Sequence, residues 1–165
     1  MPLFIFIAVL TLVLDQVSKL WIKSYFETHM LEFGNSLTSG DHLLDITYAV
    51  NTGAAFSIFP NQKYLFIVIT LSALMGILYY YFKAKEDSKC FTIGLSLIFG
   101  GALGNLIDRV RFGYVIDFLD LHWKNVYHWP TFNLADSAIC VGVGLLMLYL
   151  FMHQEEPKPV EEKAS

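Results

Sequence analysis

Two aspartates, Asp117 and Asp136, have the residue type and the surroundings that acid–base catalysis requires. Asp117 lies in the apolar sequence Val-Ile-Asp-Phe-Leu at 115–119, and the 18 residues 118–135 separate it from Asp136. A loop of this length can bring both carboxyl groups into one site. Like-charge repulsion then raises the pKa of one group, so that one is protonated and the other ionised at working pH. Such a pair can activate water for attack on an amide carbon while protonating the carbonyl oxygen, which is aspartic peptidase chemistry.

The same carboxylates allow other interpretations. Asp120 and Asp108 are alternative partners in a pair, and Asp136 alone could be a first-turn carboxylate favoured by a helix macrodipole. Asp15, Asp108 and Asp136 could also line a proton or cation path in a small channel or transporter. That path needs polar residues through the whole bilayer, and the second and fourth apolar segments offer few of them. A protein devoted to helix packing or assembly would leave the carboxylates without a purpose.

Signatures of metal, cofactor or serine hydrolase chemistry are missing from the sequence. Cys90 and Cys140 lie far apart and form no C-x-x-C pair, so we interpret both as structural thiols. No two of the five histidines have the spacing that puts two ligands on one helix face. The H-E-x-x-H, G-x-S-x-G and phosphate-loop motifs do not occur. We therefore expect neither a metal nor another cofactor.

The elements that must position the two aspartates are four apolar segments. A chain of 165 residues that is 55% hydrophobic and 16% charged is typical of an integral membrane protein, here with one domain over 1–152. A helix of about 19 residues covers roughly 28 Å, the thickness of a hydrocarbon core. The net charge of -4 gives no basic surface for nucleic acid. We predict an all-α polytopic fold with spans over about 3–22, 64–82, 91–107 and 134–152.

Alternating spans would gather the membrane-level polar residues at one end of the bundle. The long loops 24–62 and 110–133 also meet at that end. Ionisable groups at membrane depth are costly, so this gathering predicts a functional site. Its members are Asp15 and Lys19 from the first span, Asn105, Asp108 and Arg109 from the third, and Asn133 and Asp136 from the fourth.

Several of these residues also have a purely structural explanation. Asp15 and Lys19 stand four apart on one helix face and can neutralise one another, so we expect a supporting or lipid-contacting role for them. The G-x-x-x-G spacing at 100–104 favours close helix packing. Near the end of the third span, Asn105 and the pair Asp108–Arg109 could cap the helix or orient a bound group.

The loops and the tail have distinct compositions. Residues 43–50 are rich in apolar and β-branched types and precede a turn signal at 51–53, which predicts a short strand. The aromatic residues of 112–132 favour the membrane interface, so we expect this loop to lie on the membrane. The acidic tail 153–165 is expected to be disordered. Lysines in the short connection 83–90 weakly favour cytoplasmic termini.

Five motifs in this order resemble those of the prolipoprotein signal peptidases, the bacterial signal peptidase II family of membrane aspartic peptidases. They are Leu-Asp-Gln-Val-Ser-Lys at 14–19, Asn-Thr-Gly-Ala-Ala-Phe-Ser at 51–57, Gly-Gly-Ala-Leu-Gly-Asn-Leu-Ile-Asp-Arg at 100–109, Val-Ile-Asp-Phe at 115–118 and Phe-Asn-Leu-Ala-Asp-Ser at 132–137. Residues 24–42 and the acidic tail carry no family signature.

The resemblance implies a monomeric four-helix enzyme of the bacterial cytoplasmic (inner) membrane, with both termini in the cytoplasm and Asp117 and Asp136 as the catalytic pair near the outer leaflet. A small extracytoplasmic β element and a short amphipathic segment would map onto 24–62 and parts of 110–133. Substrates of this family are diacylglyceryl-modified prolipoproteins, cut on the amino side of the lipidated cysteine, with the acyl chains held in the membrane lipid. Residues implied to shape or support the site are Asn51, Gly53, Gly101, Gly104, Asn105, Asp108, Arg109, Asn133 and Ala135, with Asp15 and Lys19 near the lipid-binding region.

Overall fold

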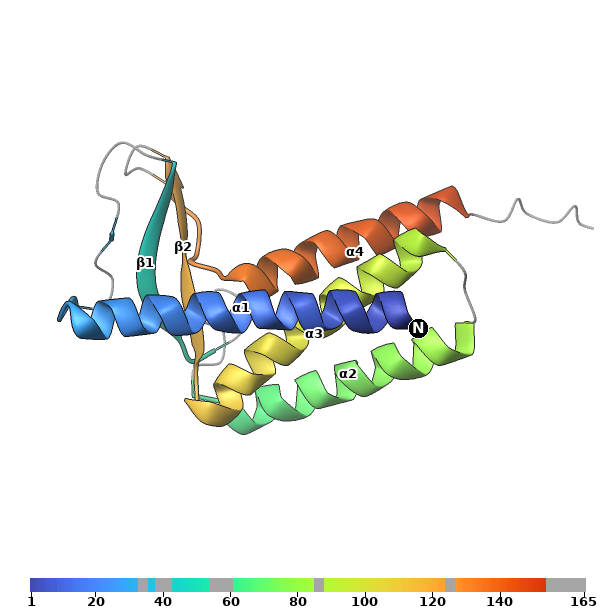
Figure 1. Ribbon diagram of the computed structural model, residues 1–165, viewed down its shortest axis with the longest axis horizontal. Helices are drawn as coiled ribbons and strands as arrows, with labels where there is room; N and C mark the ends of the chain where they lie inside the picture. Colours follow the sequence, from blue (N-terminus) through green and yellow to red (C-terminus); the bar gives the residue numbers. More distant parts are fainter. Residues whose placement is uncertain (33–35, 38–42, 54–60, 85–87, 124–126, 154–165) are drawn as a thin grey trace, which may run out of the picture.

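Four long helices form the bundle in the computed structural model, which describes residues 1–32, 36–37, 43–53, 61–84, 88–123 and 127–153. They are α1 (Pro2–Thr28), α2 (Lys63–Ala84), α3 (Lys89–Arg111) and α4 (Leu134–Met152). Each is long and apolar enough to cross a membrane. They alternate in direction, and the sheet lies at the end of the bundle opposite the N-terminus (Figure 1). The prediction of four spans is confirmed.

Helix α3 occupies the centre of the bundle. About 56% of its most apolar stretch is buried, against 22% or less for the other helices, and it packs against α1, α2 and α4. Glycines permit this close packing. A Cβ atom at Gly100 would lie 2.6 Å from the Ala8 carbonyl oxygen of α1, and one at Gly101 would lie 2.5 Å from that of Ala135 in α4. The packing role expected for the G-x-x-x-G spacing is therefore confirmed.

Helix α1 continues beyond the predicted end at residue 22, as far as Thr28. Its final turns leave the apolar bundle and bury side chains against the sheet instead of against lipid. The sequence prediction ended too early because hydropathy reports the membrane and not this second contact. The resulting apolar cluster contains Ile22 and Phe26 of α1 together with Tyr48, Ile116 and Phe118 of the strands.

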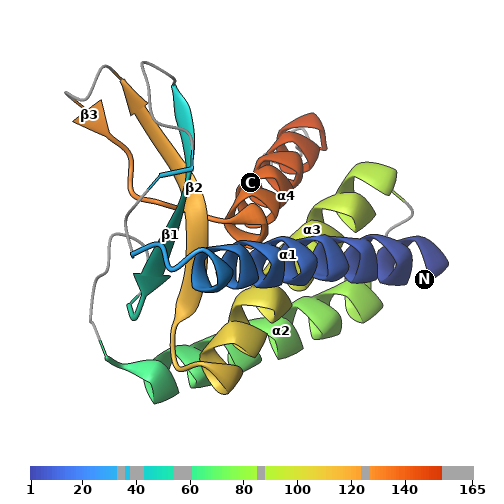
Figure 2. The ribbon, with the colours of Figure 1, turned by 60° about the vertical axis from the view of Figure 1, so that its left-hand side comes forward.

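A three-stranded antiparallel sheet runs across the end of the bundle (Figures 1 and 2). Its strands are β1 (Leu44–Asn51), β2 (Val115–Trp123) and β3 (Tyr127–His128), in the order β1-β2-β3. Strand β1 confirms the prediction for 43–50. The register shifts between Ile46 and Ala49, as in a β-bulge. Antiparallel pairing of β1 with β2 places Asn51 opposite Val115 and so beside the start of β2.

Part of the loop 110–133 forms β2 and β3, which its aromatic composition did not indicate. Apart from the ends of α1 and α3, the described residues of the two long loops contain no helix, so the expected amphipathic segment is not found among them. Residues 33–35, 38–42 and 54–60 of the first loop, and residues 154–165 of the tail, lie outside the described residues.

Candidate active site

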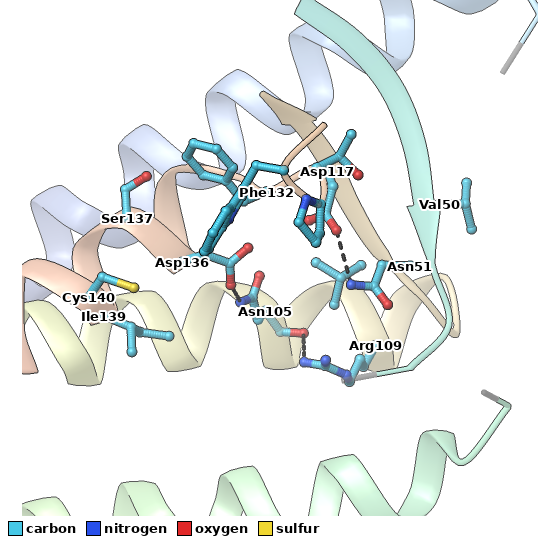
Figure 3. Close-up of a pocket in the computed structure, with 14 residues that line it drawn as sticks. Val50, Asn51, Asn105, Arg109, Asp117, Phe132, Asp136, Ser137, Ile139 and Cys140 are labelled. Carbon is cyan, nitrogen blue, oxygen red and sulfur yellow. Dashed lines mark hydrogen bonds between the residues drawn. The ribbon is translucent and has the colours of Figure 1, made fainter. Parts of the chain in front are cut away.

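A cavity of about 780 Å³ lies between the sheet and the first turns of α4 (Figure 3). Asp117 of β2 and Asp136 of α4 both line it, so the structure brings together the pair singled out by the sequence. Asp120 faces Asp45 across the sheet and does not line the cavity. The rest of the polar lining is Asn51, Asn105, Arg109, Thr131 and Ser137, and apolar residues including Phe132 and Ile139 complete the wall.

Asp117 is almost fully buried near the start of β2. Its Oδ2 accepts a hydrogen bond from Asn51 Nδ2 at 3.1 Å, and its Oδ1 accepts one from Asn133 Nδ2 at 2.7 Å. Burial disfavours the ionised form, and the nearby charge of Asp136 adds to this effect. Together they raise the pKa of Asp117 to about 7, although the two amide donors oppose the shift. A carboxyl group with this pKa can hold a proton near neutral pH.

Asp136 lies in the first turn of α4 and forms a capping box with Asn133. The Asn133 backbone N–H donates to Asp136 Oδ2 at 3.2 Å, and the Asp136 backbone N–H donates to Asn133 Oδ1 at 2.9 Å. Asn105 Nδ2 donates to Asp136 Oδ1 at 2.8 Å. These contacts fix the carboxyl group at the cavity wall.

The side chain of Asn133 forms hydrogen bonds with both aspartates. Its side chain is fully buried, its oxygen caps α4, and its Nδ2 donates to Asp117 Oδ1 and lies 3.2 Å from both Asn105 Oδ1 and the Ile116 carbonyl oxygen. The side-chain amide of Asn133 therefore holds the start of α4 next to the start of β2. Sequence reasoning gave Asn133 a supporting role without finding this junction.

Lys19 lies at the centre of the buried charges. Its Nζ is 2.9 Å from Asp15 Oδ2, 3.1 Å from Asp108 Oδ2 and 2.8 Å from Asn105 Oδ1. The expected pairing of Asp15 with Lys19 is confirmed, but both side chains are fully buried. The lipid-contacting alternative is therefore wrong, because protein groups surround the two charges on every side that lipid would need to reach.

Asp15 and Asp108 also hold the backbone that carries the two aspartates. Asp15 Oδ1 accepts from the Ala135 N–H at 3.0 Å, and Asp108 Oδ2 accepts from the Ile116 N–H at 3.2 Å. Ala135 and Ile116 directly precede Asp136 and Asp117 in the chain. Gln16, the neighbour of Asp15 in the chain, bonds to Asp108, since its Nε2 donates to Asp108 Oδ1 at 3.0 Å. Sequence reasoning did not nominate Gln16, although it lies inside the motif at 14–19.

Arg109 lines the cavity and binds the turn that follows β1. Its Nη2 donates to the Gly53 carbonyl at 3.1 Å, and its guanidinium lies 5.3 Å from the ring centre of Phe66 in α2. The Gly53 N–H in turn donates to Asn51 Oδ1 at 3.0 Å, which leaves Asn51 Nδ2 directed at Asp117. Arg109 and Gly53 thus orient Asn51, as a supporting role requires.

Small residues allow the helices to bring these groups together. A Cβ atom at Gly104 would collide with Asp15 Oδ2, and one at Gly101 would collide with the backbone of Ala135. Ala135 itself has no exposed surface. All the supporting residues expected from the sequence are therefore found at or directly behind the cavity.

Comparison with known proteins identifies the family. The family model for signal peptidase (SPase) II matches residues 7–152, which include all five motifs. The chain belongs to the signal peptidase II family. Membership decides between the functions that the sequence left open, because this signal peptidase is an aspartic endopeptidase and not a channel or transporter. With its four apolar helices, it is a multi-pass protein of the bacterial cytoplasmic membrane.

Individual relatives agree along nearly the whole chain. The lipoprotein signal peptidase of Geobacter metallireducens is 47% identical over 149 residues, which cover 88% of each protein. That of Clostridium novyi is 40% identical over 152 residues, covering 92% of this chain and 97% of the relative. A solved structure described as a bacterial membrane enzyme, determined by the in meso method at 2.3 Å, is 34% identical, with a TM-score of 0.80 and 96% coverage of both chains.

Proposed function

We propose that Asp117 and Asp136 are the catalytic dyad of this signal peptidase, and that its substrates are diacylglyceryl-modified prolipoproteins cut on the amino side of the lipidated cysteine. Removal of signal peptides from prolipoproteins is the activity of the family. One observation carries the assignment. The two carboxyl groups line one cavity and are joined through the buried amides of Asn105 and Asn133.

The two environments support a division of labour. Asp117 holds the proton of the pair, in keeping with its raised pKa, and Asp136 is the carboxylate. Asp136 takes a proton from a water molecule as the water oxygen bonds to the amide carbon, while Asp117 protonates the carbonyl oxygen. The resulting diol collapses with cleavage of the C–N bond. The leaving nitrogen takes the proton from Asp136, and a diol hydroxyl returns one to Asp117, so that no covalent intermediate forms.

The position of the cavity suits a lipidated substrate. We place the site at the outer leaflet and both termini in the cytoplasm. Lys83 lies in the last turn of α2 and Lys89 begins α3 at the end of the bundle away from the sheet, and lysines in a short connection favour the cytoplasmic side (Figure 1). Ile139 and Cys140 continue the cavity wall along α4 toward the bilayer, and Asn51 and Asp117 belong to the sheet at the bundle end. Acyl chains can therefore remain in the membrane lipid while water approaches from the sheet side.

The test is cleavage of a diacylglyceryl-modified prolipoprotein by detergent-purified protein, followed by gel shift, with an unlipidated precursor in parallel. Asp117→Asn and Asp136→Asn should fold, as judged by size exclusion and thermal unfolding, and lose cleavage by at least about a thousandfold. Asp120→Asn is the matched control on the same strand and should retain wild-type cleavage. Equal cleavage of both precursors would contradict the lipidated substrate, and an active Asp117→Asn or Asp136→Asn variant would contradict the dyad.

Asp15→Asn tests the difference between the dyad and its support. The two carboxylate oxygens of Asp15 accept from different donors, Lys19 and the Ala135 N–H. An asparagine keeps one of these two contacts through its single oxygen, so a fraction of the activity should survive. Complete loss in a normally folded variant would show that the charge of Asp15 is indispensable.

A further inference from the structure

Lys19 has no spare bonding capacity. An ammonium group carries three N–H donors and no acceptor, and Lys19 Nζ has three acceptors within 3.1 Å. Two of them are the carboxylates of Asp15 and Asp108, and the third is the amide oxygen of Asn105. Full burial removes water as an alternative partner. Lys19 therefore does more than neutralise two carboxylates, because its third bond is directed at a residue of the cavity.

That third bond decides which way the amide of Asn105 faces. Lys19 can only donate, so Asn105 must turn its oxygen toward the ammonium, and its nitrogen then points to Asp136 Oδ1 at 2.8 Å. Asn133 Nδ2, at 3.2 Å from the same oxygen, favours the same orientation. The opposite orientation would bring the amide oxygen against Asp136, a contact that is favourable only when Asp136 is protonated.

The other charges around Asp136 do not supply an equivalent bond. Asp117 is the titratable group of β2 at the cavity, and its oxygens accept from Asn51 and Asn133. Arg109 of α3 donates to the backbone oxygens of Gly53 and Asn105 rather than to Asp136. From α1, Asp15 bonds the neighbouring Ala135 N–H. Among the described side chains, Asn105 is the one that donates to Asp136.

We propose that Lys19 is a positioning residue for the catalytic dyad. By holding the oxygen of Asn105, it directs the amide N–H at Asp136 and makes Asp136 the ionised member that activates water, which leaves the proton on Asp117. The inference rests on the proposed function, because it assumes that these two aspartates do the chemistry. Lys19 belongs to α1 and does not line the cavity, yet in this proposal it helps to determine which aspartate is the base.

The decisive measurement is the pH dependence of kcat/KM with the lipidated prolipoprotein. Lys19→Met combined with Asp15→Asn removes the directing donor and keeps the net charge of the buried cluster. The acid limb of the profile should move to higher pH by about one unit, with about tenfold slower cleavage below it. Lys19→Arg, which also only donates, should hold the acid limb nearer its wild-type position than the Met variant does.

The Asn105→Ala variant is a second test of the proposal, and it leaves the ions of the buried cluster in place. It should move the acid limb in the same direction, and the Lys19 and Asp15 changes should add nothing further in that background. If they shift the profile equally with and without Asn105, Lys19 acts as a distant charge and the proposal fails. An unchanged profile in the Asn105→Ala variant also overturns it, whether or not the Lys19 variant folds. Failure of the dyad itself would be recognised separately, from wild-type cleavage by Asp117→Asn or Asp136→Asn.

Discussion

Two lysines of α1 lie one helical turn apart but in different environments, one in a buried ion cluster and the other in a surface ion pair. Lys19 is enclosed by Asp15 and Asp108, whereas Lys23 meets Glu27, whose side chain is 61% exposed. Removing one partner of a buried ion pair costs about 3–5 kcal/mol, and an exposed pair contributes about 1 kcal/mol or less. Lys19→Met should therefore lower the thermal unfolding midpoint in detergent by many degrees, and Lys23→Met should barely change it. Equal shifts in the two variants would show that water reaches the cluster.

The raised pKa of Asp117 links stability to pH with a defined sign. The carboxyl group has an ordinary pKa of 3.8 and one of about 7 in the folded protein. Between these values the folded state holds a proton that the unfolded chain has lost, so this group's contribution is full below about pH 4 and is lost as pH rises through about 7. Asp117→Asn removes the contribution. Its unfolding midpoint, measured relative to wild type, should rise from about pH 4 to about pH 7 and then level off, and parallel curves would contradict the shift.

Residue type and spacing indicated Asp117 and Asp136 but left Asp108 and Asp120 as alternative partners, and the resemblance to the family made the choice. None of these signals identified all the groups that hold the two aspartates. Asn133 has the appearance of an ordinary helix cap in the sequence, and only the fold shows that its amide also reaches Asp117. Gln16 gave no separate signal because its neighbours Asp15 and Lys19 account for the polarity of that helix face. Hydrogen-bond partners that are far apart in the chain are set by helix packing, which spacing along one segment does not report.

At the scale of elements, the approach of α1 to α3 decides whether the cluster can form. A methyl group at Gly104 would meet the carboxylate of Asp15, whereas one at Gly76 of α2 would meet nothing within 4 Å. Gly104→Ala should lower the unfolding free energy by about 1–3 kcal/mol and reduce cleavage. Gly76→Ala, the matched control, should leave both unchanged or raise stability slightly. A stable and fully active Gly104→Ala variant would show that the two helices can separate without harm to the site.

Hydropathy located all four helices, because a run of about 20 mostly apolar residues is the length that a helix needs to cross a bilayer. It did not locate the end of α1, where Phe26 turns from lipid to the sheet. Strand β2 was also missed by composition, since Asp117, Asp120 and His122 interrupt the apolar alternation that marks a strand. These residues depart from the local pattern because they serve the site or the opposite face of the sheet.

At the scale of the whole molecule, the charges and the cavity share one end of an otherwise apolar bundle. The sheet lies across the end of the bundle at which α4 begins (Figure 2). Residues of both the sheet and α4 line the cavity there. A peptide bond next to a membrane-embedded lipid can therefore meet water and the two carboxyl groups together. This arrangement serves the proposed reaction only if the sheet faces away from the cytoplasm.

That orientation can be tested with two single-cysteine variants at opposite ends of the bundle. In a background with Cys90 and Cys140 replaced by alanine, Glu32→Cys follows the end of α1 and Lys83→Cys lies in the last turn of α2, both at exposed positions. A membrane-impermeant maleimide should label Glu32→Cys in intact spheroplasts, and Lys83→Cys only after permeabilisation. The reverse pattern would put the cavity on the cytoplasmic side. Because translocated precursors carry their peptide on the outer side, that result would refute the proposed placement even in a variant that still cleaves its substrate in detergent.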